Sequence, residues 1–454
     1  MDEKTLRDKI NADFPKIVDF LKELVTIPAI SALPQHEADM VKSAEFIVGR
    51  LAKAGFEAKI TTVQDPKTGR TSRPAIIGEK PGPAGAPTVL LYAHHDVMPA
   101  DGQSGWNTSP FVSVEKDGRL YGRGASDDGA GIAVHLATLR AWGENLPVTV
   151  KLFIEGEEEV GSPTFHAFLE KHRDFMESDV IIVTDSSNWD AQTPALTTGL
   201  RGVLIVDVTV RTLTHAVHSG QFGGVVLDAL TSLCRLIATL HTDTGVVAVP
   251  GLVRDLSADV DYPEADLREQ LGAVDGLKLI GEGDLTARLW TQPTVTVIGI
   301  DCPDVEHSGN VLLPEATARI SMRIAPGENP QQAGAALTDY LQAHVPFGAE
   351  VTVNVREYGP AYAADLEAPA MKLMQGALTD AFDQSAVHIG VGGSIPFIAT
   401  FQELFPHAQI LVTGVEDPLS QAHSENESQD LAALQAAALA ETLFLGRLAA
   451  AGLR

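Results

Sequence analysis

The spacing of apolar residues predicts alternating helices and strands in the first part of the chain. Apolar positions recur every three to four residues from Thr5 to Val25 and from His36 to Ala54, which is the period of an amphipathic helix. Short β-branched and apolar runs indicate buried strands. These strands are predicted at Glu57 to Val63, Ala75 to Glu79, Thr88 to Tyr92, Val148 to Ile154 and Val180 to Val183, with a further helix at Ala130 to Trp142. This order predicts an α/β fold with a mixed, largely parallel sheet and helices on both faces.

The pattern changes after Asp185. The next elements are predicted in the order strand, helix, strand, strand, helix, strand, at Val203 to Val210, Gly223 to Leu240, Thr294 to Ile298, Ala316 to Ile324, Pro330 to Val345 and Glu350 to Val355. This βαββαβ order indicates an inserted α+β module of ferredoxin-like topology. We therefore expect a first domain made of residues 1–199 and 359–454, with an inserted domain at 200–358. The stretch from Thr242 to Trp290 is long for a connection, and such insertions often carry function or an interface.

Composition and charge exclude several classes of protein. The chain has 454 residues, of which 44% are apolar and 20% are charged, so a globular protein with two domains is expected. Its formal net charge is -27. Nucleic acids and anionic membrane surfaces would repel such a chain, so neither is an expected partner.

The cysteines and the two ends of the chain predict a reducing compartment. Only Cys234 and Cys302 are present, which is too few for a disulfide framework, and we expect buried free thiols. The amino-terminal segment is charged and helically periodic, without the apolar run of a signal peptide, so the cytoplasm is the expected location. The apolar stretch from Leu431 to Leu453 is interrupted by polar residues and is predicted to be a packed helix.

Residues that bind divalent metals occur in five segments far apart in the chain, most of which follow predicted strands or their turns. They are His94 and Asp96 in YAHHDVMP, Asp127 in GRGASDDGAG, Glu158 and Glu159 in EGEEEVGS, Asp185 in VIIVTDSS, and His423 in QAHSENE. Ligands of open α/β sheets gather at the carboxyl ends of the strands, so we expect these distant segments to converge. Imidazole nitrogens and carboxylate oxygens are zinc ligands, and the set predicts a two-metal hydrolase.

Several neighbouring residues have simpler interpretations. His95 is expected to pack or to form a hydrogen bond, because successive side chains of a strand point to opposite faces. Asp128 precedes a predicted helix and suits its N-cap. Glu155 and Glu157 are expected to be solvated charges, the usual fate of acidic runs. The segment GVGGS at Gly390 to Ser394 lacks the lysine of a phosphate-binding loop, so a nucleotide site is not predicted.

Eight motifs, taken together, resemble one enzyme family. They are WNTSPF, LYGRGASDD, EGEEEVGS, GLRG, HSGQFGG, SMRIAP, GGSIPF and AHSENE. The chain resembles, over nearly its whole length, the co-catalytic metallopeptidase family of cytosolic dipeptidases and carnosinases, aminoacylases, glutamate carboxypeptidases and succinyl-diaminopimelate desuccinylases. The resemblance is greatest to the dipeptidase and carnosinase branch.

The resemblance implies a site for two divalent metal ions in each subunit. The implied ligands are His94 for one metal, Asp127 as the bridge, Glu159 and Asp185 to complete the two positions, and His423 to close the second. Asp96 would orient His94, as the second ring nitrogen of a ligating histidine usually meets a carboxylate or carbonyl. Zinc is the favoured metal, with manganese and cobalt as alternatives.

The resemblance also implies the residues that act on the substrate. Glu158 would be the general base, because a carboxylate beside the ligands can take a proton from water and deliver it to the leaving amine. His218 would stabilise the oxyanion, reaching the neighbouring subunit of a homodimer formed through the inserted domain. Arg323 would pair with a free carboxylate, and Asn310 and Ser394 would hydrogen-bond the substrate. Seen alone, His218 could be an exposed loop histidine and Arg323 a structural ion-pair partner.

The expected activity is hydrolysis of the amide bond in dipeptides or short peptides with a free C-terminal carboxylate. An N-acyl amino acid deacylase or desuccinylase would use the same site, and a non-catalytic metal-binding scaffold is the third alternative. Two departures from the family pattern stand out. Asp127 to Ala130 reads DDGA where the family has DDKG, and Gly390-Val391 replaces the Arg-Glu of carnosinase-like enzymes, which alters the substrate side.

Overall fold

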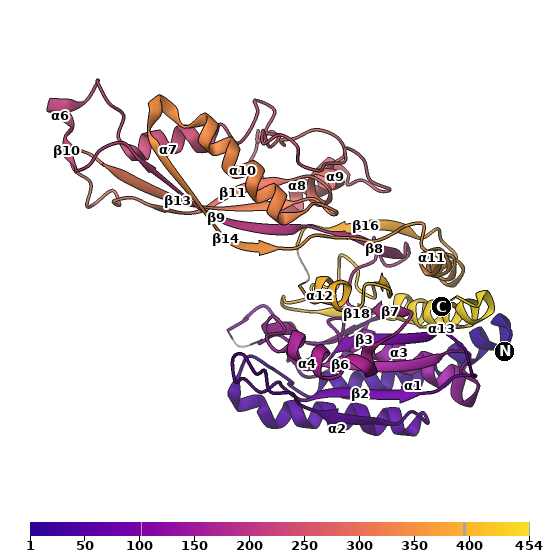
Figure 1. Ribbon diagram of the computed structural model, residues 1–454. Coiled ribbons are helices and arrows are strands. Elements are labelled where there is room, and N and C mark those ends of the chain that lie inside the picture. The colour runs from indigo at the N-terminus through magenta and orange to yellow at the C-terminus, as the bar shows by residue number, and fades with distance from the viewer. Residues whose placement is uncertain (101, 394–395, 454) are drawn as a thin grey trace. The chain divides into compact units, whose positions relative to one another are not determined.

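The computed structural model describes residues 1–100, 102–393 and 396–453, and the chain divides into two compact units (Figure 1). Unit 1 comprises Met1–Thr198, Ala364–His388 and Thr400–Arg454, and unit 2 comprises Gly199–Ala363 and Ile389–Ala399. The second unit therefore includes Ile389–Ala399, a segment that the sequence analysis placed with the first domain. The roles of the two units as catalytic and lid domains are proposals.

A six-stranded sheet lies at the centre of unit 1, in the order β1-β2-β6-β3-β7-β17. The last four strands in this order are parallel to one another, whereas β1 and β2 are antiparallel to their neighbours. The predicted mixed, largely parallel sheet is thus confirmed. The strands are β1 (Ala58–Thr61), β2 (Ala75–Lys80), β3 (Thr88–His94), β6 (Thr149–Glu155), β7 (Val180–Val183) and β17 (Gln409–Val412).

Helices cover both faces of this sheet. On one face, Leu91 and Leu152 share a core with five helices, α1 (Glu3–Val25), α2 (Glu37–Lys53), α3 (Gly129–Trp142), α11 (Pro369–Phe382) and α13 (Leu431–Ala451). On the other face, Phe153 stacks on Phe168 of α4 (Phe165–Lys171), with ring centroids 4.7 Å apart. Leu152 and Phe153 are successive residues of β6, so their side chains point to opposite faces of the sheet and pack in two separate cores.

The remaining elements are short. A three-stranded sheet joins β4 (Val114–Lys116), β5 (Arg119–Tyr121) and β18 (Ser428–Asp430), and another joins β8 (Ala195–Leu200), β15 (Tyr362–Ala363) and β16 (Val387–Val391). The other short elements are α5 (Arg173–Met176), α6 (Ser219–Phe222), α12 (Pro396–Leu404), and the paired strands β10 (Val217–His218) and β12 (Val311–Leu312). Strand β10 contains His218, one of the candidate residues.

Helix α13 is long and apolar enough to cross a membrane by length and composition alone. However, 67% of its apolar window is buried inside the protein, where it packs against α1, α3 and α11. Asp430 caps its first turn by accepting hydrogen bonds from the backbone N–H groups of Ala432 and Ala433. The predicted packed helix is the arrangement found.

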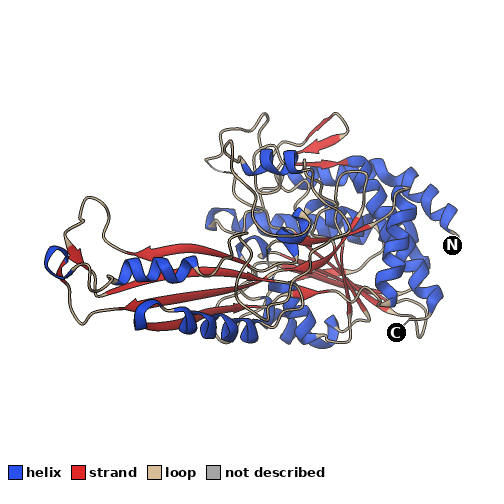
Figure 2. Cartoon of the chain, turned by 90° about the horizontal axis from the view of Figure 1, so that it is seen from above, coloured by secondary structure: helices blue, strands red, loops and turns tan. Residues whose placement is uncertain are grey.

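Unit 2 contains a four-stranded antiparallel sheet in the order β11-β13-β9-β14. Its long strands are drawn in red in Figure 2. Alternate residues of β9 and β13 pack against two helices and form the core of the unit. The elements follow one another as β9 (Gly202–Arg211), α7 (Ala229–Ala238), β11 (Thr294–Asp301), β13 (Glu315–Ile324), α10 (Pro330–His344) and β14 (Glu350–Gly359). This is the βαββαβ order read from the sequence, and its ferredoxin-like classification stays a prediction.

Two expectations for unit 2 were wrong. Helix α7 begins at Ala229 and not at Gly223, because Asp228 caps it by accepting the N–H of Thr231. Cys234 and Cys302 are free thiols, as expected, but both are exposed and not buried. The helical period at 223–240 therefore overestimated both the length of the helix and the burial of Cys234.

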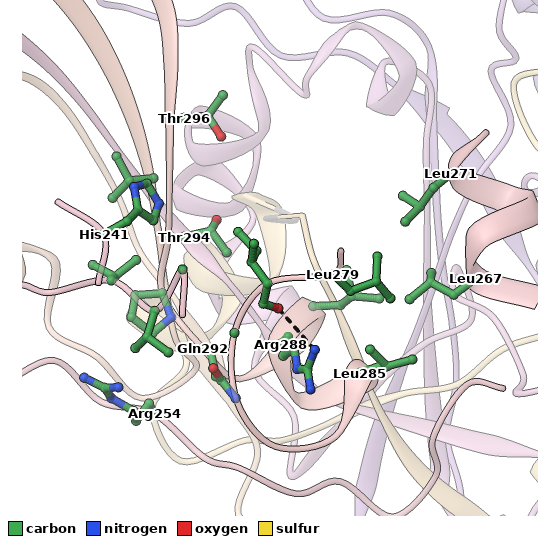
Figure 3. A pocket seen from close by; sticks show the side chains of 18 residues that line it. His241, Arg254, Leu267, Leu271, Leu279, Leu285, Arg288, Gln292, Thr294 and Thr296 are labelled. Atoms are coloured by element: carbon green, nitrogen blue, oxygen red, sulfur yellow. Dashed lines mark hydrogen bonds between the residues drawn. The ribbon is translucent and has the colours of Figure 1, made fainter. Parts of the chain in front are cut away.

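The long stretch before β11 is folded around a cavity of about 290 Å³ (Figure 3). It contains α8 (Glu264–Leu271) and α9 (Leu285–Trp290), whose leucines line one side of the cavity. Arg288 donates hydrogen bonds to the carbonyls of Ile280 and Gly283, and Gln292 donates to those of Asp255 and Glu282. These long side chains fix the loops of the segment itself.

Candidate metal centre

His94 is the last residue of β3, and its buried imidazole lies among carboxylates. Its Nδ1 atom is 3.0 Å from the backbone oxygen of Asp96 and 3.4 Å from a carboxylate oxygen of the same residue. Its Nε2 atom is 2.9 Å from Asp127 Oδ1 and 3.9 Å from Asp185 Oδ1. Contacts with Asp96 thus fix the ring on one side, and the other nitrogen faces Asp127 and Asp185.

Asp127 lies between two imidazoles. While Oδ1 contacts His94, Oδ2 lies 2.9 Å from Nε2 of His423, and that nitrogen is also 3.1 Å from Glu159 Oε2. Two groups of ligand atoms result, each within 4.8 Å, one formed by His94, Asp128 and Asp185 and one by Asp127, Glu159 and His423. The segments predicted to converge from the sequence therefore meet within unit 1.

Asp128 has structural contacts that Asp127 lacks. Its Oδ1 accepts the N–H of Gly131 and caps α3, which confirms the predicted N-cap. Its Oδ2 accepts the backbone N–H of His94 at 3.1 Å. Both oxygens of Asp128 are thus engaged by backbone donors, whereas both oxygens of Asp127 face imidazoles. This contrast favours Asp127 as the residue shared by two metal ions.

Asp96 links the ends of two neighbouring strands. Its two carboxylate oxygens accept the backbone N–H groups of Glu158 and Glu159, each at 3.1 Å. The same residue contacts His94 at the end of β3, as described above. Asp96 therefore fixes the position of the short turn after β6 relative to the imidazole.

The carboxylates of the centre are held in an environment that disfavours their charge. Burial and the negative charges nearby raise the pKa of Glu158 to about 9, that of Glu159 to about 7 and that of Asp185 to about 6. Contacts with Asp127 and Glu159 raise the pKa of His423 to about 11. Within the described residues, no Lys or Arg forms an ion pair with these three carboxylates. This excess of buried acidic groups beside two imidazoles fits a site for divalent cations.

Glu155 and Glu157 are buried, so the prediction of solvated charges was wrong. The hydroxyl of Tyr92 donates to Glu155 at 2.7 Å, and burial raises the pKa of Glu155 to about 8. Glu157 accepts the backbone N–H groups of Arg73 and Thr164. Glu155 and Glu157 lie at the end of β6 and in the turn after it, inside the protein, whereas Glu158 and Glu159 are partly exposed. His95, in contrast, forms the expected structural contacts, 2.8 Å from the carbonyl of Pro74.

Two further acidic residues beside the centre were not predicted. Glu416 follows β17, accepts a hydrogen bond from the hydroxyl of Ser187, and has its pKa raised by burial and by the charges of Asp127 and Asp185. Glu427 is completely buried and accepts the backbone N–H of Asp127. The AHSENE motif contains Glu427, but nothing in its local pattern distinguishes a buried carboxylate from an exposed one.

The remaining candidate residues belong to unit 2. His218 is exposed, its Nδ1 accepts the N–H of Gly220, and β10 pairs it with Val311, next to Asn310. Arg323 lies near the other end of the ten-residue strand β13. At about 3.3 Å per residue, such a strand separates its ends by roughly 30 Å. One chain therefore does not bring His218 and Asn310 together with Arg323. Ser394 lies outside the described residues.

A second arginine accompanies Arg323. Thr294 of β11 pairs directly with Arg323, and Nη1 of Arg201 donates to the hydroxyl of Thr294 at 3.4 Å. Burial and the charge of Arg323 lower the pKa of Arg201 to about 10. In the part of the chain that the structure describes, neither guanidinium has an acidic partner. Two close cations without a counter-charge make this strand end suited to an anion.

Comparison with known proteins identifies the family. Residues 90–446 match the model of peptidase family M20/M25/M40. The chain is 31% identical over 438 residues to a cysteinylglycine-S-conjugate dipeptidase of Corynebacterium striatum, covering 95% of both chains. It is 27% identical to the Beta-Ala-His dipeptidase of Rattus norvegicus, covering 91% of this chain and 88% of the relative.

Solved structures agree with this assignment. Human carnosine dipeptidase 1 matches with a TM-score of 0.71, 25% identity and 99% coverage of both chains. The fold is also that of the di-peptidase Dug1p of Saccharomyces cerevisiae, with a TM-score of 0.73, 22% identity and 99% coverage of both chains. The chain therefore belongs to peptidase family M20/M25/M40 and is a peptide-bond hydrolase.

Proposed function

We propose that the protein is a metal-dependent dipeptidase that hydrolyses dipeptides or short peptides with a free C-terminal carboxylate. The observation that carries this proposal is the position of Asp127, with one carboxylate oxygen against His94 and the other against His423. The curated relatives described above are named as dipeptidases, which favours a small peptide as the substrate. The cytoplasm remains the proposed location.

The donor set can accommodate two divalent cations. His94 and Asp185 would hold one and Glu159 and His423 the other, with Asp127 shared between them and Asp96 orienting His94. Nitrogen and carboxylate donors favour zinc, with manganese and cobalt as alternatives. Two such ions would supply the positive charge that polarises the scissile carbonyl and lowers the pKa of a water molecule.

Glu158 is the proposed general base. Its backbone N–H is held by Asp96, while its carboxylate belongs to neither group of ligand atoms. Burial and the acidic charges nearby raise its pKa to about 9, and the positive charge of two cations would lower this pKa, so that the carboxylate could take a proton from the attacking water and then deliver it to the nitrogen of the leaving amine. Glu159, one residue later, would remain a ligand.

The proposed substrate contacts come from unit 2. Arg323, with Arg201 beside it, would bind the C-terminal carboxylate through the planar fork of a guanidinium. His218 would stabilise the oxyanion of the tetrahedral intermediate, and Asn310 and Ser394 would hydrogen-bond the substrate. His218 and Asn310 lie far from Arg323 in the same unit, which supports a homodimer in which they serve the partner's site.

The test is hydrolysis by the metal-stripped enzyme before and after reconstitution with Zn²⁺ or Mn²⁺. Matched dipeptides are compared with N-acetyl and N-succinyl amino acids of the same leaving residue. We expect metal-dependent cleavage of the free-amine dipeptides. Preferential cleavage of the acylated series would instead make the protein a deacylase, and cleavage of neither series would indicate a non-catalytic scaffold.

A further inference from the structure

Glu427 lies four residues after His423 and has a completely buried carboxylate with an unusual number of donors. Oε1 accepts the backbone N–H groups of Ser126 and Asp127 and the hydroxyl of Ser126, at 3.0 to 3.1 Å. Oε2 accepts the N–H of Gly124 at 3.1 Å and Nη1 of Arg123 at 2.7 Å. One side chain thus holds the whole segment that ends at Asp127.

The hydrogen-bond network around Glu427 extends to the backbone of His423 through the side chains of Arg123 and Gln103. Nη2 of Arg123 donates to Oε1 of Gln103 at 3.0 Å, and Nε2 of Gln103 donates to the backbone carbonyl of His423 at 3.1 Å. The carbonyl of Glu427 also accepts the N–H of Gly122 at 2.9 Å. The segment carrying Asp127 and the loop carrying His423 are therefore tied together by Glu427, Arg123 and Gln103.

The two groups of ligand atoms differ in what supports them. His94 ends β3 and Asp185 follows β7 by two residues, so backbone pairing within the large sheet fixes both. His423 belongs to no helix or strand, and its backbone has a positive φ of 64°. Its position therefore depends on contacts made by side chains.

We propose that Glu427 is a positioning residue. It sets Asp127 and His423 at the spacing needed to hold the second metal ion, for which Glu159 is the third ligand. The proposal rests on the proposed function, because it concerns the same metal site. It adds that the two metal positions depend unequally on one buried carboxylate. Glu427 itself touches neither the metal nor the substrate.

The chemistry of the network requires a carboxylate at this position. Every group around the two oxygens of Glu427 is a donor, and a glutamine would turn one of its own N–H₂ donors against them. A buried donor facing another donor loses its hydrogen bond and is costly. Glutamine is nearly the same size as glutamate, but it places a hydrogen-bond donor where one of the two accepting oxygens of Glu427 lies.

The experiment measures binding of Zn²⁺ alone to the full-length, metal-stripped protein by calorimetry at neutral pH. For Glu427→Gln we expect one of the two equivalents to bind about 10- to 100-fold more weakly, the usual effect of removing a residue that orients ligands. The other equivalent should weaken much less, because it depends on Glu427 only through the shared Asp127. The proposal is overturned if both equivalents bind as in the unsubstituted protein, or if both weaken to the same extent.

The matched control is Glu441→Gln. Glu441 is also a buried acid of unit 1 paired with a basic side chain, His135 at 2.8 Å, but it contacts no candidate ligand. The control should lose stability and keep both metal equivalents. If it also loses one equivalent, the effect of Glu427→Gln is a general result of destabilisation and the proposal fails.

A milder variant covers the case in which Glu427→Gln does not fold. Gln103→Ala removes the contact with the carbonyl of His423, together with the hydrogen bonds that Gln103 Oε1 accepts from Arg123 and Trp106, at a partly exposed position. We expect a smaller weakening of the same single equivalent, and unchanged binding would overturn the proposal. Binding of Zn²⁺ tests the role of Glu427, and peptide hydrolysis tests the proposed function. A negative result in one measurement is therefore distinct from a negative result in the other.

Discussion

Glu158 differs from the proposed ligands because, among the described residues, its carboxylate belongs to neither group of ligand atoms. We expect Glu158→Gln to lower kcat by about 100-fold or more, since an amide cannot take the proton of the attacking water. The metal content, measured on the same preparation, should be unchanged. Glu170→Gln, which changes an exposed acid of α4, should keep full activity. A Glu158→Gln enzyme with normal kcat would exclude Glu158 as the base.

The pair formed by His135 and Glu441 predicts a pH dependence of stability. Burial alone would lower the pKa of His135, but the charge and hydrogen bond of Glu441 outweigh it, so the pKa is raised above 6.5. The stabilisation by this pair is therefore complete below pH 6.5 and is lost as the pH rises through the folded-state value. Glu441→Gln should cost more free energy of unfolding at pH 6 than at pH 9 in urea denaturation. An equal cost at the two pH values would contradict this assignment.

At the residue scale, the sequence predicted the residues that come together but not the residues that support them. His94 ends β3, and Glu159 and Asp185 lie four and two residues after the ends of β6 and β7, so their convergence follows from the sheet. Glu157 and Glu427 were misread or missed, because their donors lie 84 and 300 residues away in the sequence. A buried carboxylate and a solvated one have the same local pattern until the fold supplies the partners.

The ends of helices and strands could be predicted where an apolar run stops. They were harder to predict where a capping side chain determines the first residue of a helix. Strand β7 has the predicted bounds, because a run of four β-branched residues defines it. Helix α7 starts six residues later than its apolar period suggested, at the residue after the Asp228 cap. Helical periodicity does not reveal which turn has a side chain to satisfy its free N–H groups.

The cap of α7 gives a prediction at the scale of the element. Asp228→Ala removes the acceptor for the N–H of Thr231 and should lower the free energy of unfolding by about 1 kcal/mol. Asp228→Asn retains an acceptor and should cost much less. Urea denaturation of both variants provides the comparison, and equal stabilities would show that Asp228 does not contribute as a cap.

At the scale of the whole molecule, the separation of His218 from Arg323 predicts that two chains build each site. Chains of His218→Ala and Glu158→Gln, each nearly inactive alone, should regain activity when they are mixed and allowed to exchange subunits. A mixed dimer would combine the intact Glu158 of one subunit with the intact His218 of the other. Sedimentation of the protein as a monomer, or a mixture no more active than its components, would refute this arrangement.

The two compact units differ from the expected domain bounds by a few residues at 199 and 359–363, and by one separate segment. Ile389–Ala399 follows a helix of unit 1, so the sequence alone places it there. In the structure, Arg201 donates to the carbonyl of Gly392, and a Cβ atom at Gly390 would lie 2.6 Å from that of Trp290. These contacts are with residues 100 and 191 positions earlier in the chain, and no local pattern contains that information.

The interrupted course of unit 1 has a consequence for biosynthesis (Figure 1). A ribosome completes His94, Asp127, Glu159 and Asp185 early, then makes nearly all of unit 2, and only afterwards reaches β17, His423 and α13. Domains fold during synthesis as their residues emerge. The nascent chain therefore carries an acidic cluster that lacks its last imidazole until the segment with His423 has been made and has emerged.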